Sequence, residues 1–262
     1  MIPKVIHYCW FGGEPKPKSV LRCIDSWKKH CRGFEIREWT EKDFDVTQNL
    51  FTKQAYEAKA WGFVPDYIRL WIIYTHGGIY LDTDVQVIRD LSALLKHKAF
   101  AGFEDDSYVA LGLGFGAEPG DPLIYEHMQQ YEAMRFILED GSQNRKGSPQ
   151  HTTEFLLEKG LQQKCREAQQ VGSMTIYPPE YFCPKNFHTG LMNITPNTYS
   201  IHQYDSSWFT EEEQEQKKKR WKAMKARQRK DKLLYWRYLP NRVILKILGQ
   251  ERYDALKKRL SR

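Results

Sequence analysis

Apolar and polar positions along this chain follow two periods, and the change from one to the other predicts strands followed by helices. A nearly continuous apolar run over residues 4–11 predicts a buried strand, and a period-two pattern over 34–39 predicts a second one. Between them, residues 19–30 are helix-like, after Pro15 and Pro17 have ended the first strand. Strands alternating with helices predict an α/β domain with a largely parallel sheet.

The same alternation continues to about residue 202. The pattern predicts helices over 51–61, over 66–76 after a first-turn Pro65, over 122–139 and over 152–170, and strands or hairpin pieces over 79–87, 99–103, 111–116 and 194–202.

The chain changes character after residue 210. Three glutamates at 211–213 precede the Lys-Lys-Lys-Arg run at 217–220, an order that suits a helix macrodipole. Further on, leucine, isoleucine and aromatic residues are mixed with Arg and Lys, and we expect Pro240 to separate two helices. We therefore predict one domain over 1–210 and a basic amphipathic helical tail over 211–262, of a kind that can lie in a membrane interface.

The net charge of +7 conceals a division between these two parts. Residues 217–262 contain 18 Lys/Arg and three acidic residues, which gives +15, whereas residues 1–216 contain 22 Lys/Arg and 30 Asp/Glu, which gives −8. The body is acidic and the tail strongly basic, so the overall isoelectric point says little about partners.

Composition indicates a folded protein. Hydrophobic residues make up 41% of the 262 and aromatic residues 14%, which is typical of a globular core. No apolar run approaches the roughly 20 residues of a transmembrane helix. The first residues enter a strand at once, so we expect no signal peptide. Five cysteines without C-x₂-C spacing favour reduced thiols in a cytosolic compartment.

The segment 77–85, Gly-Gly-Ile-Tyr-Leu-Asp-Thr-Asp-Val, contains the clearest chemical signal. On a strand, Asp82 and Asp84 would point to one face, at the carboxyl end where open α/β sheets bind ligands. Adjacent carboxylates repel each other and therefore need a cation or a raised pKa. Mg²⁺ or Mn²⁺, which prefer oxygen ligands, fit best. The sequence thus predicts a site for a metal and a diphosphate.

Other residues could complete this site. Asp66 and Arg69 share a helical face and could hold sugar hydroxyls and a phosphate, although a plain ion pair would explain them equally. Trp10 could stack on a nucleobase or simply be buried. His202 is a candidate ligand, since Mn²⁺ accepts nitrogen, and it could equally be a core histidine. We expect His7 to be structural.

Three motifs together carry a resemblance to a known family. They are Ile-Pro-Lys-Val-Ile-His-Tyr-Cys-Trp-Phe-Gly at 2–12, Asp-Tyr-Ile-Arg at 66–69, and Gly-Gly-Ile-Tyr-Leu-Asp-Thr-Asp at 77–84. Their order and spacing resemble glycosyltransferase family 32, whose DXD-containing members include bacterial capsule and lipopolysaccharide enzymes and yeast initiating mannosyltransferases. The clostridial glucosylating toxins are similar in the same motifs. The resemblance extends to about Phe209.

The resemblance implies a GT-A nucleotide-diphospho-sugar transferase fold with a Rossmann-like central sheet, here followed by the basic helical extension. It implies metal-dependent, anomer-retaining transfer of a hexose from a nucleotide sugar, with roles for eight residues. Asp82, Asp84 and Arg69 would be catalytic; Trp10, Asp66, Arg69, Asp82, Ser206 and Trp208 would bind the donor; Asp82, Asp84 and His202 would hold Mn²⁺ or Mg²⁺.

The resemblance also guides the expected partners. A UDP-sugar is favoured over GDP-mannose as donor, and the acceptor would be a glycan or a lipid-linked glycan of a bacterial surface polysaccharide. The tail would bind an anionic membrane surface, each nearby Lys or Arg contributing about 1 kcal/mol, and no nucleic acid. The protein would be cytoplasmic and peripheral at the inner face of the cell membrane.

Three alternatives remain. A phosphatase of the haloacid dehalogenase type also places Asp-x-Asp after an apolar strand and would use Asp82 as nucleophile, but Gln86 stands where Thr or Val is expected. A nucleic-acid-binding protein could use the basic tail, against which the acidic body counts. A transferase fold that has lost catalysis could serve as a scaffold, although every matched motif position is intact.

Overall fold

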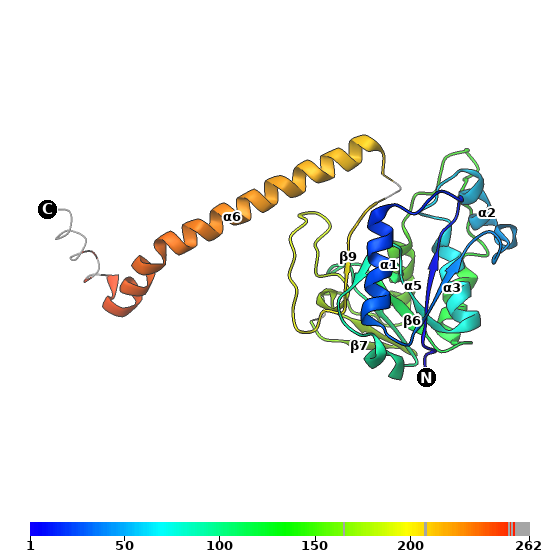
Figure 1. Ribbon diagram of the computed structural model, residues 1–262, viewed down its shortest axis with the longest axis horizontal. Helices are drawn as coiled ribbons and strands as arrows, with labels where there is room; N and C mark the ends of the chain where they lie inside the picture. The colour runs from blue at the N-terminus through cyan, green and yellow to red at the C-terminus, as the bar shows by residue number, and fades with distance from the viewer. Residues whose placement is uncertain (165, 207–208, 251, 253, 255–262) are drawn as a thin grey trace. The chain divides into compact units, whose positions relative to one another are not determined.

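The computed structural model describes residues 1–164, 166–206, 209–250, 252 and 254 (Figure 1). The strands are β1 (Val5–Cys9), β2 (Glu35–Trp39), β3 (Gly78–Tyr80), β4 (Val85–Val87), β5 (Ala99–Gly102), β6 (Phe115–Ala117), β7 (Gln169–Val171), β8 (Met174–Tyr177) and β9 (Ser200–His202). The α-helices are α1 (Lys18–His30), α2 (Leu50–Glu57), α3 (Pro65–His76), α4 (Pro122–Gln130), α5 (Ser148–Glu158) and α6 (Glu211–Leu248). Short 3₁₀ turns are η1 (Val46–Gln48), η2 (Ser92–Lys96), η3 (Leu111–Leu113) and η4 (Pro179–Tyr181).

The α/β class with a large central sheet is confirmed, but the expectation of a largely parallel sheet is wrong. Seven strands pair in the order β2-β1-β3-β6-β5-β8-β7. β1 pairs in parallel with β2 and β3, and β5 with β8, whereas β6 runs antiparallel to both its neighbours and β7 antiparallel to β8. The sheet is mixed because β7 and β8 form a hairpin and the short β6 enters between β3 and β5.

Helix α3 leads directly into the strand before the carboxylates. Pro65 is in its first turn, as predicted, and Gly77 ends it with a positive φ of 64° that favours glycine. A β-carbon on Gly77 would come within 3 Å of the rings of Pro3 and Pro119, so glycine is also required for space. The helix packs beside β1 and β3. The carboxyl ends of these two parallel strands therefore lie at one sheet edge.

Three helices end earlier than the sequence pattern predicts, and the first of them, α2, stops at Glu57. Helix α4 stops at Gln130, because the side chains of Asn49 and Gln54 bind the backbone that follows, at the carbonyl of Tyr131 and the N–H groups of Phe136 and Ile137. Helix α5 stops at Glu158, where Gly160 adopts a φ of 96° and the Leu161 N–H closes back on the Leu156 carbonyl. The late strand begins only at Ser200, after Pro196 and a Thr195–Thr198 turn.

The single strand predicted over 79–87 is two strands. β3 stays in the central sheet, a turn follows at Asp82–Asp84, and β4 pairs antiparallel with β9 in a separate two-stranded sheet. Helix α1 holds β4 in place: the Trp27 indole N–H donates to the Val85 carbonyl at 2.7 Å, and the Val87 N–H donates to the Ser26 hydroxyl at 3.0 Å.

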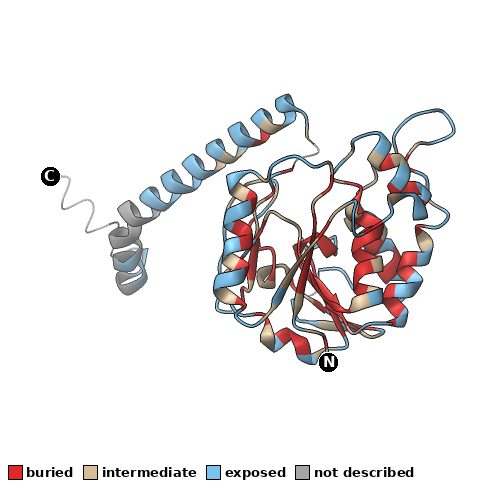
Figure 2. Cartoon of the chain, turned by 45° about the vertical axis from the view of Figure 1, so that its right-hand side comes forward, coloured by how far each residue is buried: buried red, intermediate tan, exposed pale blue. Residues whose placement is uncertain are grey.

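Buried residues, red in Figure 2, concentrate on the strands and on the inward sides of the helices. His7 is part of this core, at 2% exposed. Its Nδ1 accepts from the Trp39 indole and its Nε2 contacts the Gly77 carbonyl at 3.0 Å, so the proton lies on Nε2. Burial lowers the pKa of His7 to about 4. The expected structural role of His7 is confirmed.

The chain divides into two compact units, one of residues 1–186 and 192–210, the other of residues 187–191 and 211–262. In the second unit, α6 continues through Pro240, so the expected break there is wrong. A proline removes one backbone hydrogen bond from a helix without always ending it. Among the described residues, none of the helices combines the length and apolarity needed to cross a membrane.

Candidate active site

Asp82 and Asp84 follow β3 at the carboxyl edge of the sheet, joined by a turn. The Val85 N–H donates to the Asp82 carbonyl at 3.0 Å, which closes that turn. On the other side, the Asp82 N–H donates to the Gly112 carbonyl in η3 at 3.0 Å. The two carboxylates are thus brought together by a turn held at both ends, and not by the alternation of a strand.

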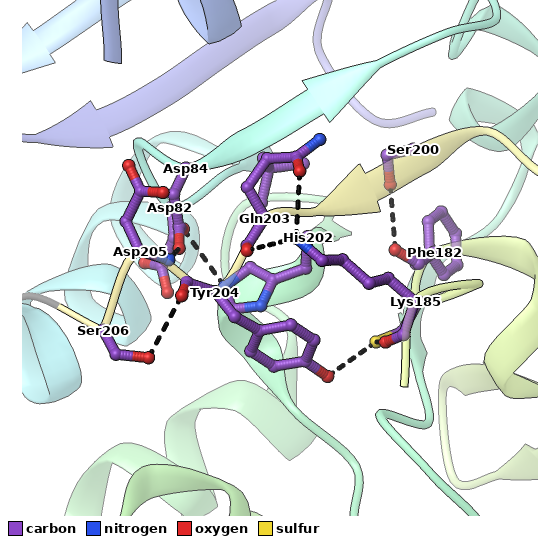
Figure 3. Close-up of polar contacts among 12 residues, drawn as sticks. Asp82, Asp84, Phe182, Lys185, Ser200, His202, Gln203, Tyr204, Asp205 and Ser206 are labelled. Carbon is purple, nitrogen blue, oxygen red and sulfur yellow. Dashed lines mark hydrogen bonds and ion pairs between the residues drawn. The ribbon is translucent and has the colours of Figure 1, made fainter. Parts of the chain in front are cut away.

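His202 joins them through the pairing of β4 with β9. Val85 is opposite His202 in this ladder, so the His202 imidazole lies next to Asp84. His202 Nε2 lies 3.1 Å from Asp84 Oδ1. One ligand atom from each of Asp82, Asp84 and His202 lies within 4.8 Å of the others (Figure 3). The structure therefore assembles the three side chains that the sequence proposes as metal ligands.

Electrostatics keep Asp84 ionised. Burial alone would raise the pKa of Asp84, but the His202 ring and the Asp205 N–H, which donates to Asp84 Oδ2 at 2.9 Å, lower it to about 2. Burial lowers the pKa of His202, and the Asp84 carboxylate more than reverses this, so the pKa is raised. Nδ1 of His202 is buried and has no hydrogen-bond partner among the described residues.

This donor set fits a divalent cation. Two carboxylates and an imidazole supply hard oxygen ligands and one nitrogen, a combination that suits Mn²⁺ and is acceptable to Mg²⁺. All three residues are half-buried. Binding through Nε2 of His202 requires the ring proton to be on Nδ1.

Arg69 connects the candidate cation site with helix α3. Its Nη2 lies 3.0 Å from Asp66 Oδ1 and 3.6 Å from Asp82 Oδ1. Asp66 and Arg69 are 4% and 5% exposed, so this is a buried charge cluster rather than a surface ion pair. The guanidinium also lies 5.2 Å from the Tyr80 ring centre. Arg69 thus places a fixed positive charge beside Asp82.

The pKa of Asp66 responds mainly to burial. Desolvation raises it to about 7, against the opposing effect of the Arg69 guanidinium. Arg69 stays charged, because Asp82 and Asp66 outweigh the cost of its own burial and raise its pKa. A carboxyl that exchanges its proton near neutrality is suited to hydrogen-bonding a sugar hydroxyl.

Gly112 is a site residue that the sequence interpretation missed. A β-carbon there would lie 2.0 Å from Asp82 Oδ2 and 3.2 Å from Arg69 Nη1. Any larger side chain must displace the Asp82 carboxylate. The signal in the sequence is the Leu-Gly-Leu-Gly-Phe-Gly run at 111–116, whose pattern predicts only a strand or hairpin.

The segment after β9 wraps around Asp84. The Gln203 N–H donates to the Asp84 carbonyl at 2.9 Å, in addition to the Asp205 contact. Tyr204 and Ser206 have φ values of 58° and 49°, an uncommon conformation for residues other than glycine. Ser206 is buried, and its hydroxyl donates to the Tyr204 carbonyl. The predicted donor contact Trp208 lies outside the described residues.

A buried polar network supports this segment, and sequence interpretation missed it too. The Tyr204 ring meets the His202 ring edge-on at 4.4 Å, and its hydroxyl lies 2.8 Å from Cys183 Sγ and hydrogen-bonds the Glu104 carboxylate. The Lys185 ammonium donates to the Gln203 carbonyl at 2.7 Å. Figure 3 shows the Tyr204 ring beside His202, and Lys185 on the same side of His202 as Phe182.

Trp10 follows β1 at the same sheet edge as Asp82, because β1 and β3 run in parallel. The indole is half-buried, and its N–H donates to the Glu14 carbonyl at 2.7 Å. The Lys16 ammonium lies 5.6 Å from the ring centre. Trp10 is thus available at the correct edge, but a base stacking on the face that Lys16 covers would have to displace that lysine.

Residues 17–101 match the family model described as a glycosyltransferase sugar-binding region containing a DXD motif. Over 142 residues the chain is 28% identical to inositol phosphoceramide mannosyltransferase 3 of Schizosaccharomyces pombe, an alignment that covers 52% of this chain and 38% of that protein. The chain thus spans well under half the length of this relative.

Two solved glycosyltransferase structures are also similar. One is the PaToxG glycosyltransferase, with 14% identity, a TM-score of 0.46, and coverage of 61% of this chain and 69% of that one. The other is a glycosyltransferase involved in glycosylation of the major capsid of PBCV-1, with 12% identity, a TM-score of 0.48, and coverage of 86% and 100%. By its match to the family model, the chain resembles the DXD glycosyltransferases over residues 17–101.

Proposed function

We propose that this protein transfers a hexose from a nucleotide sugar to a glycan acceptor, with a divalent cation held by Asp82, Asp84 and His202. The observation that carries the proposal is the convergence of these three side chains beside the buried Asp66–Arg69 pair. Two acidic ligands and a neighbouring guanidinium form an arrangement that can bind a diphosphate through a cation while a sugar lies next to it.

Some site residues would neutralise the charge on the diphosphate, and others would position the sugar. A bound cation would neutralise the charge that develops on the departing diphosphate. Arg69 adds a second, permanently placed positive charge on the Asp82 side of the site. Asp66 and Asp82 offer carboxyl oxygens for the sugar hydroxyls. Arg69 holds the Asp66 carboxylate, and the turn at Asp82–Asp84 fixes the backbone of Asp82.

We further propose that the anomeric configuration is retained. Asp66 and Asp82, the carboxyls nearest the proposed sugar position, both contact Arg69, and neither is free to act as a covalent nucleophile without breaking that contact. These contacts argue against a covalent glycosyl-enzyme intermediate, so retention would require the diphosphate to depart and the acceptor to attack on one face of the sugar. Nuclear magnetic resonance of the first-formed product decides the point, since an inverted anomer excludes this mechanism.

The donor and acceptor are proposed by class. A UDP-hexose is the favoured donor, and a glycan or lipid-linked glycan of a surface polysaccharide is the favoured acceptor, used at the inner face of the cell membrane. Because one relative is named as an inositol phosphoceramide mannosyltransferase, GDP-mannose and an inositol-phosphate lipid are included as test substrates.

The test is nucleotide release from a panel of UDP- and GDP-sugars, with Mn²⁺, with Mg²⁺ or with EDTA. Slow hydrolysis of one donor that requires the cation supports the proposal and names the donor. If no donor is hydrolysed, calorimetry with the same panel measures binding directly. If none of the nucleotide sugars binds, the proposal is overturned and a scaffold is favoured. A phospho-aspartate on Asp82 would instead favour the phosphatase alternative.

A further inference from the structure

Helix α6 joins two segments of different chemistry without a break in the backbone. Residues 217–232 contain ten Lys/Arg and one acidic residue, Asp231. Residues 233–248 contain no acidic residue, three Lys/Arg and eleven leucine, isoleucine, valine, tryptophan or tyrosine residues. A strongly cationic segment is thus followed directly by an apolar one, which also carries positive charge.

The cationic segment, residues 217–232, is largely exposed. Figure 2 shows α6 exposed over most of its described length. Lys219 pairs with Glu215 at 2.9 Å and Arg227 with Asp231 at 3.9 Å, both within one turn of the helix. The other exposed cations of the segment have no ion pair among the described residues; they are Lys218, Arg220, Lys222, Lys225, Arg229, Lys230 and Lys232.

One side of the cationic segment is fixed within its own unit. The Trp221 indole N–H donates to the Phe187 carbonyl at 2.8 Å, and a β-carbon on Gly190 would lie 2.5 Å from the Trp221 ring. Gly190 has a φ of 64°, so both space and backbone conformation favour glycine there. Lys217 is buried, with its ammonium 5.5 Å from the Trp221 ring centre. The fixed side leaves the other sides of the helix available to a partner.

The apolar segment, residues 233–248, exposes side chains that a helix of a soluble protein normally covers. Leu233 is 72% exposed, Leu234 39% and Val243 47%. Leu233 and Leu234 directly follow the cationic segment, so a partner that covers them also meets its charges. An anionic lipid surface does so, because headgroups attract Lys and Arg while the acyl boundary accepts leucine and aromatic side chains. A nucleic acid would attract the cations but offers no comparable place for exposed leucines.

We propose that α6 binds the surface of an anionic lipid bilayer, with residues 217–232 on the headgroups and Leu233, Leu234 and Val243 in the interface. This inference goes beyond sugar transfer and does not depend on it. In this proposal the basic residues of α6 attach the protein to the membrane surface and take no part in sugar transfer.

The experiment is co-sedimentation of the full chain with vesicles of phosphatidylcholine alone and of phosphatidylcholine mixed with phosphatidylglycerol. One variant, Lys222→Gln/Lys225→Gln/Arg229→Gln, removes three exposed cations from α6. A second, Leu233→Asp/Leu234→Asp, removes the exposed apolar pair. The matched control, Arg22→Gln/Lys29→Gln/Lys42→Gln, removes three exposed cations from the first unit. Circular dichroism verifies that each variant is folded.

We expect the wild type and the control to bind the mixed vesicles, and to bind phosphatidylcholine alone weakly. The first variant should bind the mixed vesicles roughly 100-fold more weakly, since each basic residue near an anionic surface contributes about fivefold. The second should lose about tenfold or more. Equal binding to both vesicle types, or undiminished binding by the two α6 variants, overturns the proposal. Tighter binding to duplex DNA or RNA than to vesicles would assign α6 to nucleic acid instead.

Discussion

His202 Nε2 lies 3.1 Å from Asp84 Oδ1, although the two residues are far apart in the sequence. The contact exists because β4 and β9 form their own antiparallel pair, in which Val85 is opposite His202. The other oxygen of Asp84 accepts the Asp205 N–H. Asp84 therefore links the candidate cation site with the segment that follows β9, and its replacement is expected to affect both.

Asp84→Asn retains the shape of this side chain but removes its charge. We expect cation-dependent nucleotide release to fall by more than about 100-fold, because the variant loses an anionic ligand and leaves His202 without its partner. Release from the favoured donor and Mn²⁺ binding by electron paramagnetic resonance are the measurements. Asp90→Asn, in an exposed turn where Asp90 accepts from Ser92, is the control. Unchanged Mn²⁺ affinity in Asp84→Asn would remove Asp84 from the site.

Gly112→Ala tests whether close approach of the backbone sets the position of Asp82. The added methyl group would lie 2.0 Å from Asp82 Oδ2, so the carboxylate must turn away. We expect nucleotide release to fall by about tenfold or more, with a loss of unfolding free energy of about 1–3 kcal/mol. Gly147→Ala is the matched control, since its β-carbon would meet only Pro149, at 3.4 Å. Full activity in Gly112→Ala would show that Asp82 tolerates displacement.

Tyr204→Phe removes a hydroxyl from the network behind His202 and keeps the ring. The Glu104 carboxylate and Cys183 thiol lose a buried partner, which should lower the unfolding free energy by about 1–3 kcal/mol. Because these hydroxyl contacts anchor the ring that packs against His202, we also expect cation affinity to fall by about tenfold. Calorimetric titration with Mn²⁺ checks this, with Tyr125→Phe on the exposed side of α4 as control. Lower stability with unchanged affinity would limit Tyr204 to a structural role.

His7 should make folding stability depend on pH. Burial lowers its pKa to about 4 in the folded protein, from 6.5 in the unfolded chain. Above pH 6.5 neither state is protonated, so the contribution of His7 is complete there. As the pH falls from 6.5 to 4, only the unfolded chain gains a proton, and up to about 3 kcal/mol is lost.

The comparison of wild type with His7→Gln isolates this contribution, because other titrating groups such as Asp66 are common to both proteins. Urea unfolding at several pH values gives the free energies. We expect the advantage of the wild type to shrink as the pH falls from 6.5 to 4. A constant difference over this range would mean that His7 does not titrate as its burial indicates.

The sequence alone is sufficient to predict the parts of the site that depend on local contacts. Asp66 and Arg69, three residues apart on a helix, form the ion pair that their spacing indicates, and Pro65 and Gly77 mark the ends of that helix. Asp82 and Asp84 come together as predicted, but for a different reason, since a turn replaces the expected strand. The i, i+2 spacing is compatible with both, and only the pairing of β4 with β9 distinguishes them.

Contacts between residues far apart in the chain could not be predicted from the sequence. The proximity of Gly112 to Asp82, and of Glu104 and Cys183 to Tyr204, depends on loops whose paths no local pattern determines. The mixed sheet has the same origin, because the direction of β6 follows from the connection between β5 and β6 and not from its own residues. Helix ends were missed where side chains such as Asn49 and Gln54, distant in sequence, bind the backbone.

The two-stranded sheet constrains how this chain can vary in length. Val85, Gln86 and Val87 pair with His202, Ile201 and Ser200, and side chains alternate between the two faces of such a ladder. Inserting or deleting one residue within β9 would place Ile201 or Gln203 opposite Val85 and turn the imidazole to the opposite face. Insertions in the loops between β4 and β9 leave that register intact. Changes of length in those loops can therefore accumulate without moving His202, whereas a single-residue deletion within β9 should abolish the Asp84–His202 contact.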